Sequence, residues 1–281
     1  MNTLAQVLAQ CELPALEARM LAGCVLEKNS AWLIAHADEP VSAKSEKAIA
    51  ALVERRLRGE PMAYILGERE FYGLPLRVTP AVLIPRPETE LLVELALSRM
   101  AADAAMRVLD LGTGSGAIAV ALAKARPQAQ LTAVDVEYAA LGVARENARR
   151  NGVRVRFFCG NWFGPVPGES FDLIVSNPPY VAAEDPHLLQ GDVRFEPDRA
   201  LVGGTDGLEC IRAIVARARA QLRPGAWLLL EHGYDQADAC RALLEAAGYG
   251  EVQSWPDLAG IPRVSGGVGP SVANSKGEAG P

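Results

Sequence analysis

The most informative stretch of the chain is Val108-Leu109-Asp110-Leu111-Gly112-Thr113-Gly114-Ser115-Gly116. An apolar, strand-like run passes directly into a turn with three glycines, and a helical run follows the turn. Glycines are needed in such a turn because side chains would block the close approach of a ligand to the backbone. The stretch therefore predicts a strand, a ligand-binding turn and a helix, as in nucleotide-binding α/β proteins.

Two acidic residues near this turn indicate the kind of ligand. Asp110 comes just before the glycines, where a carboxylate would repel a pyrophosphate but would attract an ammonium group directly or through water. The next predicted strand ends at Asp135, close to the offset of about 20 residues at which an acidic residue binds ribose hydroxyls. An amino acid joined to a nucleoside fits both features, so the sequence predicts a site for S-adenosyl-L-methionine. The predicted cofactor-binding residues here are Asp110, Gly112, Thr113, Gly114, Ser115, Gly116 and Asp135.

Two other interpretations of this turn remain open, a dinucleotide-binding dehydrogenase and a purely structural turn. The spacing G-x-G-x-G differs from the dinucleotide fingerprint G-x-G-x-x-G. Further along, Asn161 and Trp162 follow the third predicted strand, where they could read the edge of an adenine and pack against its ring. Alternatively, Trp162 and Phe163 only fill the core.

The fourth predicted strand opens into Asn177-Pro178-Pro179-Tyr180. The residue before a proline is biased towards extended backbone and proline has no N–H, so this loop is rigid. The Asn177 side chain and the Pro178 backbone each offer a carbonyl to one planar NH2 group, and Tyr180 can lie against its plane. We predict Asn177, Pro178 and Tyr180 as catalytic, the whole tetrapeptide as substrate-binding, and Asn177 as a cofactor contact as well.

This tetrapeptide suits methyl transfer to a nitrogen whose lone pair is delocalised. Such a nitrogen is a weak nucleophile, whereas a methyl group on a sulfonium is strongly electrophilic, so alignment matters more than a strong base. Two acceptors fix the nitrogen and stabilise the positive charge that develops on it. Exocyclic amino groups of adenine or cytosine fit as well as glutamine amides, so the residues alone leave the substrate open.

Apolar strand-like runs alternate with helical runs from Arg107 onward, which predicts an open, mostly parallel sheet with helices on both faces. The predicted fold class is α/β, a Rossmann-like class I S-adenosylmethionine methyltransferase with a small N-terminal helical domain. The predicted strands are 107–111, 130–135, 155–159, 171–176 and 226–232.

Four segments are predicted along the chain. Apolar residues recur at helical spacing in residues 1–66, which we expect to form a helical substrate-binding domain. Residues 67–87 are expected to form a hairpin and a proline-rich linker, and 88–264 the catalytic domain. Residues 265–281, rich in Gly, Ser and Pro, are expected to be a disordered tail.

Composition excludes several classes of protein. The formal charge is −6 and the pI about 5.3, which weighs against stable nucleic-acid binding because phosphate neutralisation needs a basic surface. The start of the chain lacks a secretory signal, and no apolar run is long enough to span a membrane. The five cysteines are scattered without a metal-binding spacing. We expect a cytoplasmic protein with no metal and no membrane partner.

Several long motifs resemble those of the release factor glutamine methyltransferases, the PrmC or HemK family, and the likeness covers residues 4–264. The motifs include Arg56-x-x-Gly59-Glu60-Pro61-x-Ala63-Tyr64-Ile65, Pro85-Arg86-Pro87-Glu88-Thr89-Glu90, Asn177-Pro178-Pro179-Tyr180-Val181, Gly191-Asp192-Val193-Arg194-Phe195-Glu196-Pro197 and Glu231-His232-Gly233.

The resemblance implies a substrate that the residues alone do not. It implies methylation of the glutamine in the Gly-Gly-Gln motif of class 1 peptide chain release factors, with S-adenosyl-L-methionine bound by residues 112–116, Asp135, Trp162 and Asn177. Asn161 departs from an Asp that the family often has, which leaves the adenine contact open. A related enzyme that methylates a glutamine of a ribosomal protein, and a nucleic-acid amino-methyltransferase, are the alternative functions. The linker residues Arg86, Glu88 and Thr89 either line the cofactor pocket or serve the start of the next helix.

Overall fold

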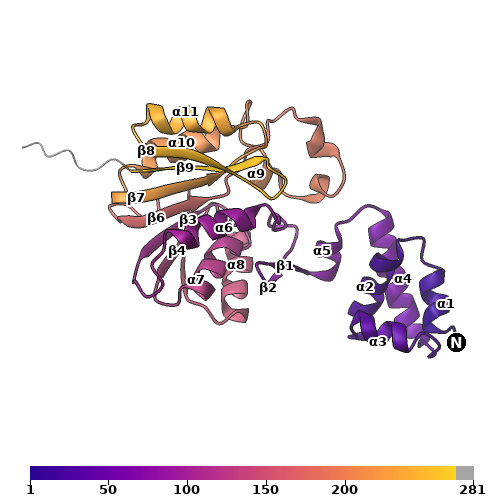
Figure 1. Ribbon diagram of the computed structural model, residues 1–281. Coiled ribbons are helices and arrows are strands. Elements are labelled where there is room, and N and C mark those ends of the chain that lie inside the picture. Colours follow the sequence, from indigo (N-terminus) through magenta and orange to yellow (C-terminus); the bar gives the residue numbers. More distant parts are fainter. Residues whose placement is uncertain (270–281) are drawn as a thin grey trace, which may run out of the picture. The chain divides into compact units, whose positions relative to one another are not determined.

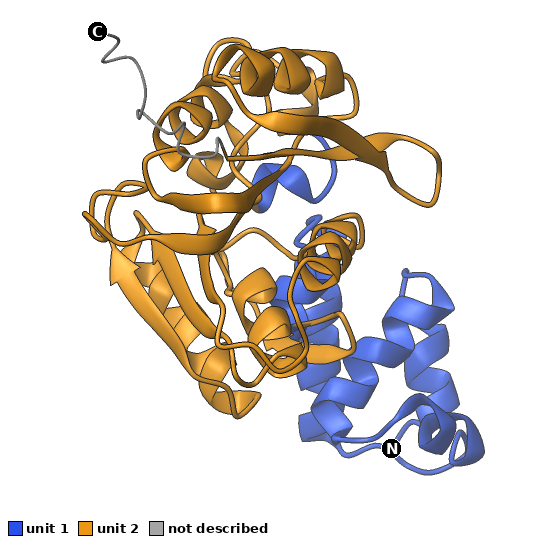
Figure 2. Ribbon diagram, turned by 60° about the vertical axis from the view of Figure 1, so that its left-hand side comes forward, with its two compact units in different colours: residues 1–68, 189–195 blue, residues 69–188, 196–281 orange. Residues whose placement is uncertain are grey.

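The computed structural model describes residues 1–269, and the chain divides into two compact units (Figure 2). Unit 1 consists of residues 1–68 together with 189–195, and unit 2 of 69–188 and the chain from 196 onward. Within residues 1–269, every helix is too short or too polar to cross a lipid bilayer.

Unit 1 is a bundle of short helices around its own apolar core, in which Leu21 and Ile49 are almost completely buried. Ser42 caps the start of the longest helix of this unit, because its hydroxyl accepts a hydrogen bond from the Ser45 N–H. Not every apolar residue of these helices is buried, since Leu16 is 60% exposed. The helices are α1 (Leu4–Ala9), α2 (Ala15–Leu26), α3 (Ser30–Ala35), α4 (Ala43–Leu57) and α5 (Met62–Leu66).

Residues 189–195 group with unit 1, although the sequence predicted one continuous catalytic segment over 88–264. Two contacts explain the difference. Arg56 on α4 forms an ion pair with Asp192 at 3.2 Å, and Arg194 donates a hydrogen bond to the Arg58 carbonyl at 3.2 Å. Two 3-10 turns shape the surrounding chain, Pro186–Leu189 and Val193–Phe195.

Unit 2 is built on a sheet in the order β5-β4-β3-β6-β7-β9-β8 over the described residues, with a separate hairpin of β1 and β2. The first five strands of this order are parallel, and their bounds match the predicted strands except that β7 covers 222–231 where 226–232 was predicted. The strands are β1 (Glu68–Phe71), β2 (Leu74–Arg77), β3 (Arg107–Leu111), β4 (Gln130–Asp135), β5 (Val155–Cys159), β6 (Phe171–Ser176), β7 (Leu222–Glu231), β8 (Gly250–Pro256) and β9 (Pro262–Val268).

Helices cover both faces of this sheet, as Figure 1 shows. Alternate residues of a strand point to opposite faces, so Val108 packs with α6 and α7 while Leu109 packs with α10 and α11. Two apolar cores result, one on each side, which is the doubly wound arrangement that the sequence predicted. The helices are α6 (Thr89–Ser98), α7 (Ala117–Ala125), α8 (Tyr138–Arg150), α9 (Asp198–Leu201), α10 (Glu209–Ala218) and α11 (Ala237–Ala246).

The chain changes direction across the sheet at β3. From β3 it runs outward to β4 and β5 on one side, then returns to β6 and β7 on the other. Loops that leave β3 and β6 therefore separate, which opens a crevice at the carboxyl ends of these strands. The Ser176 hydroxyl donates a hydrogen bond of 2.6 Å to the Leu111 carbonyl and holds the two strand ends together.

The predicted disordered tail is wrong at its start, because residues 265–268 belong to strand β9, which pairs antiparallel with both β7 and β8. The glycines that suggested disorder serve close packing. A Cβ at Gly266 would lie 2.5 Å from the Leu228 carbonyl oxygen, and one at Gly267 would lie 3.0 Å from the Tyr249 Cβ. Residues 270–281, the remainder of the predicted tail, lie outside the described part of the chain.

Candidate active site

A cavity of about 390 Å³ lies in unit 2 at the carboxyl ends of the parallel strands. Its volume is in the range of sites for small organic ligands and cofactors. The cavity wall includes eight of the predicted cofactor-binding residues: Gly112, Thr113, Gly114, Ser115, Asp135, Asn161, Trp162 and Asn177. Asp110 and Gly116, the other two, do not line the cavity.

The glycine turn keeps the backbone accessible from the cavity. Gly112, Gly114 and Gly116 all have positive φ, of 70°, 54° and 81°. A Cβ at Gly114 would meet no atom within 4 Å, so the backbone there borders open space. At Gly116 a Cβ would lie 3.1 Å from the Ala144 Cβ, so this glycine permits close packing of α7 against α8. The two glycines thus serve a ligand and the helix packing respectively.

Asp135 lies on the cavity wall at the end of β4 and is held from two sides. Its carboxylate accepts hydrogen bonds from the Gly114 N–H at 2.8 Å and from the Glu137 N–H at 2.9 Å. Burial raises the pKa of Asp135 above its ordinary value, and these backbone donors act in the opposite direction. The carboxylate is therefore fixed against the glycine turn, with lone pairs to spare for ribose hydroxyls.

Asp110 is completely buried beneath the turn. Its Oδ2 accepts a hydrogen bond of 2.6 Å from the Thr113 hydroxyl, whereas Oδ1 has no hydrogen-bond partner within residues 1–269. Burial raises the pKa of Asp110 to about 7, against the effect of the Thr113 hydrogen bond. A buried acceptor of this kind suits a cation, because an ammonium group nearby would favour its charged form.

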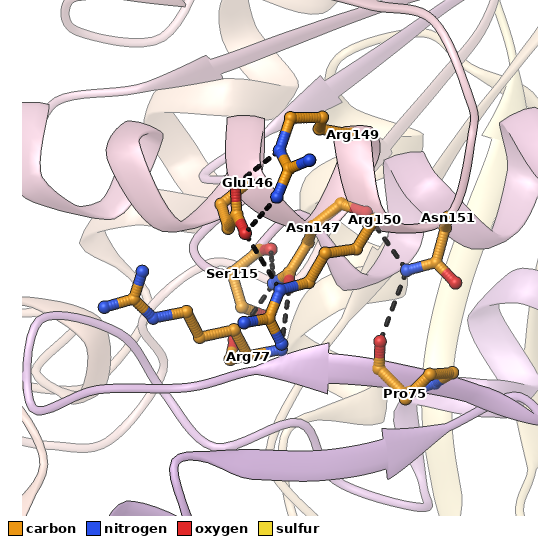
Figure 3. A network of polar contacts seen from close by, with 8 residues as sticks. All are labelled: Pro75, Arg77, Ser115, Glu146, Asn147, Arg149, Arg150 and Asn151. Carbon is orange, nitrogen blue, oxygen red and sulfur yellow. Dashed lines mark hydrogen bonds and ion pairs between the residues drawn. The ribbon is translucent and has the colours of Figure 1, made fainter.

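Asn147 on α8 braces the turn from the side, and the sequence did not suggest this role (Figure 3). Its side-chain NH2 donates to the Ser115 carbonyl at 2.8 Å and to the Arg77 carbonyl at 2.9 Å, and its oxygen accepts from the Arg77 N–H at 2.7 Å. The residue is fully buried. One amide thus joins the cofactor turn to the hairpin strand β2 and to helix α8.

The residues after β5 form a further part of the wall. Asn161 is exposed and Trp162 is half-buried. The Trp162 ring lies 3.5 Å from where a Cβ of Gly112 would be, so a side chain at that glycine would crowd the ring. Trp162 has a positive φ of 46°, which is rare for an aromatic residue, whereas Phe163 is buried in the core. Of these two neighbouring aromatic residues, Trp162 therefore lines the cavity and Phe163 packs in the apolar core.

The tetrapeptide after β6 contributes Asn177 and Pro179 to the cavity wall, while Pro178 is buried and the Tyr180 side chain lies outside the wall. The Asn177 side-chain NH2 donates a hydrogen bond of 3.1 Å to the hydroxyl of Thr89 on α6. Thr89 itself lines the cavity, so the linker end is part of the site, as one of the two interpretations of the sequence expected.

Backbone contacts with a glycine-containing loop fix the position of the tetrapeptide. The Val181 N–H donates to the Leu201 carbonyl and the Gly203 N–H donates to the Val181 carbonyl, at 2.9 and 2.8 Å. A Cβ at Gly203 would lie 2.4 Å from the Pro179 carbonyl oxygen, and one at Gly207 would lie 2.3 Å from that of Tyr180. Only glycine fits at either position.

Glu231 at the end of β7 is a buried carboxyl group next to this tetrapeptide. Its Oε1 accepts a hydrogen bond from the Tyr180 hydroxyl at 3.3 Å. Burial raises the pKa of Glu231 to about 7, while hydrogen bonds from Thr89 and Tyr180 act in the opposite direction. The sequence contained a signal for this residue, because an acidic residue ends a strongly apolar strand, but the signal did not show what the carboxyl group would contact.

The linker also contributes to the cavity wall, through residues 81–83, Pro85 and Arg86. Arg86 is held by an ion pair of 2.7 Å with Glu196, whose side chain is completely buried. Such a pair is costly to break from one side, because the other charge would remain buried. The pair therefore ties the linker to the chain that follows residue 195 and fixes one side of the cavity.

Comparisons with known proteins agree with this architecture. The model of the methyltransferase small domain matches residues 88–191, and the model of the PrmC N-terminal domain matches residues 1–67. A methyltransferase from Pyrococcus furiosus shares the fold, with a TM-score of 0.55 and 22% sequence identity over 77% of this chain and 97% of that one. The fold and the cavity define a Rossmann-like methyltransferase, for which S-adenosyl-L-methionine is the cofactor.

Two relatives in sequence carry the same name. The release factor glutamine methyltransferase of Bordetella pertussis is 56% identical over 95% of this chain and 99% of its own length. That of Neisseria gonorrhoeae is 48% identical over 90% of this chain and 93% of its own length. The chain belongs to the family of release factor glutamine methyltransferases.

Proposed function

We propose that the chain transfers the methyl group of S-adenosyl-L-methionine to the side-chain amide nitrogen of the glutamine in the Gly-Gly-Gln motif of class 1 peptide chain release factors. One observation carries the proposal. The NH2 group of Asn177 is engaged by Thr89, so the Asn177 oxygen is the amide atom left to accept a hydrogen bond at the cavity. A primary amide, which has an NH2 group and no charge, is the complementary substrate.

The cofactor half of the cavity would hold the methyl donor by three kinds of contact. Asp135 would accept hydrogen bonds from the ribose hydroxyls, and the open backbone at Gly114 would allow the ligand to approach closely. Trp162 would pack against the adenine, with Asn161 at its edge. The buried carboxyl of Asp110, joined to the wall through the Thr113 hydroxyl, would favour the ammonium end.

The acceptor half would orient the glutamine amide for attack. Bound S-adenosyl-L-methionine supplies a methyl group that is electrophilic because it is attached to a sulfonium. The Asn177 oxygen and the Pro178 carbonyl would accept hydrogen bonds from the substrate NH2 and hold its nitrogen in line with the methyl carbon. The nitrogen lone pair would form the new N–C bond as the C–S bond breaks, and the electron pair of the C–S bond would remain on sulfur. The nitrogen then gives up one proton to water.

We assign the holding of the release factor to unit 1. A cavity of about 390 Å³ has room for a small cofactor and a single side chain, whereas a stable protein–protein contact buries about 800 Å² on each partner. A further surface is therefore needed for a protein substrate. The match of residues 1–67 to the PrmC N-terminal domain supports this assignment.

Labelled S-adenosyl-L-methionine tests the proposal with three acceptors: a class 1 release factor, the same factor with its Gly-Gly-Gln glutamine changed to alanine, and duplex DNA. We expect label in the first alone. Label in a ribosomal protein, added as a fourth acceptor, with none in the release factor would instead favour the related ribosomal enzyme. Label in DNA, or equal label in the changed factor, would contradict the proposal.

A further inference from the structure

The Asn177 amide can face a substrate in two ways, and only one of them is productive. With its oxygen at the cavity it accepts a hydrogen bond from a substrate NH2, whereas with its NH2 there it would oppose another donor. The structure has the NH2 directed at the Thr89 hydroxyl, 3.1 Å away. The Thr89 hydroxyl accepts this bond and can still donate its own single proton to another acceptor. The orientation of Asn177 therefore depends on which acceptor lies next to Thr89.

Beyond Thr89 lies Glu231, which is completely buried and does not line the cavity. A carboxylate has only acceptors, so a hydroxyl beside it must act as the donor. Glu231 Oε1 accepts a hydrogen bond from the Tyr180 hydroxyl at 3.3 Å, and the nearby Thr89 hydroxyl lowers the pKa of the same carboxyl group. Its Oε2 has no hydrogen-bond partner among the described residues, so the carboxyl can accept both hydroxyls.

We propose that Glu231 is a positioning residue that directs the Asn177 oxygen towards the substrate amide through the Thr89 hydroxyl, and that fixes the Tyr180 ring beside the tetrapeptide through the Tyr180 hydroxyl. This inference rests on the proposed function, because it assumes an acceptor that presents an NH2 group. The Asn177 NH2 donates to the Thr89 hydroxyl, and Thr89 lowers the pKa of Glu231, which is the effect of a hydroxyl that directs its proton at the carboxylate. A single buried acceptor thereby sets two of the four side chains of the tetrapeptide.

The charges around Glu231 suit this role. Burial has the largest effect and raises the pKa of Glu231 to about 7, Glu88 at the start of α6 raises it further, and Arg263 on β9 lowers it. Arg263 also donates a hydrogen bond of 3.1 Å to Asp257. Burial also raises the pKa of Tyr180, so its hydroxyl keeps its proton and remains a donor to Glu231.

Four substitutions in the full chain test the inference, with kcat, the KM and the Kd for S-adenosyl-L-methionine as readouts. Glu231→Gln introduces a donor that can reverse Thr89, and Thr89→Val removes the hydroxyl at nearly constant volume. We expect each to lower kcat about tenfold and to change the Kd by less than about twofold. The double substitution should also cost about tenfold, because residues that act along one path are not additive. Thr89→Ser keeps the hydroxyl and should remain near the wild type.

Ser265→Ala is the matched control. Ser265 is a fully buried polar residue on β9 whose hydroxyl bonds to His232 and Ser254 and not to the tetrapeptide. We expect its loss to lower stability without lowering kcat. If Ser265→Ala lowers kcat as much as Glu231→Gln, if the double substitution costs about a hundredfold, or if Thr89→Ser and Thr89→Val behave alike, the inference is wrong.

A second readout needs no acceptor and separates this inference from the proposed function. The side-chain NH2 of Asn177 gives a ¹H–¹⁵N signal pair, identified by its loss in Asn177→Ala. We expect Glu231→Gln and Thr89→Val to shift this pair and Ser265→Ala to leave it unchanged. If the wild type methylates no release factor but the pair shifts as expected, only the proposed substrate fails. If the pair does not move, Glu231 does not set Asn177, whatever the substrate.

Discussion

The two ends of the cavity are built in different ways. At the cofactor end, several contacts join residues close in the chain, with Thr113 and Asp110 three positions apart and Glu137 and Asp135 two apart, while Gly114 and Asp135 are 21 apart. At the acceptor end they join distant residues, with Asn177 and Thr89 88 positions apart and Tyr180 and Glu231 51 apart. One end is a local motif, and the other is an assembly of separate strand and helix ends.

This difference has a consequence for what each end contributes. A local turn with glycines can present backbone to a cofactor wherever the strand and helix form, so it supplies binding. The acceptor end depends on several elements being in register, so it supplies alignment, on which methyl transfer to a weak nucleophile depends. Substitutions should accordingly divide into those that change cofactor affinity and those that change kcat, and four predictions follow in decreasing order of effect.

The largest effect is expected from Asn177→Ala at the acceptor end. Loss of one preorganised hydrogen-bonding group aimed at a transition state costs about 100- to 1,000-fold in kcat in well-studied enzymes, and we expect a loss of this order. The Kd for S-adenosyl-L-methionine should change only a few-fold. Steady-state kinetics and calorimetry with the same samples measure the two quantities. A parallel loss of affinity and kcat would remove the distinction between the two ends.

The reverse pattern is expected from Asp135→Ala at the cofactor end. A hydrogen bond to a charged group contributes about 1.5–3 kcal/mol, so we expect S-adenosyl-L-methionine to bind about 10- to 100-fold more weakly. At saturating cofactor, kcat should stay within a few-fold of the wild type. Titration calorimetry measures the Kd, and Asp135→Asn, which keeps the shape, serves as the control with a smaller loss. Unchanged affinity would mean that Asp135 only supports the loop.

An intermediate effect on stability is expected from Asn147→Ala, because Asn147 braces the cofactor turn against β2 (Figure 3). The change leaves buried backbone groups of Arg77 and Ser115 without partners, which costs about 1–3 kcal/mol in the free energy of unfolding. Denaturant unfolding measures this loss. Cofactor affinity should also fall, and full affinity in a destabilised variant would show that the brace does not shape the turn.

The smallest effect is expected from pH. Since burial raises the pKa of Asp110 to about 7, the cofactor-free protein binds a proton there at pH 6, and the ammonium group of the cofactor favours its release. Affinity should therefore rise up to about tenfold from pH 6 to pH 8, with proton release on binding. Without cofactor, the stability that this proton provides is lost as pH rises through about 7. Titration calorimetry in buffers of different ionisation enthalpy measures the affinity and the proton release on binding.

Asp110→Asn is the control for the pH prediction. It should reduce the pH dependence without removing it, because burial raises the pKa of Asp135 as well. If the wild type shows the same affinity at both pH values, the ammonium group does not depend on Asp110.

The difference between contacts of residues near in the chain and contacts of distant residues also explains what the sequence could predict. The parallel strands and the glycine turn follow from short patterns, and nearly all the residues chosen at the cofactor end lie on the cavity wall. Asn177 was found because its motif is continuous. The contacts of Asn147, Gly203 and Gly207 join elements that are distant in the chain, so no local pattern reveals them, and the acidic end of the apolar strand marked Glu231 without showing what it contacts. The glycines of β9 were misread as disorder, because their tight packing against Leu228 and Tyr249 is visible only in three dimensions.

Tandem mass spectrometry of a release factor treated with the enzyme and S-adenosyl-L-methionine tests the central claim most directly. The account predicts a single added methyl group on the side-chain amide of the Gly-Gly-Gln glutamine, and almost none with Asn177→Ala. A methyl group on another residue, or the same amount of product with Asn177→Ala, would contradict it.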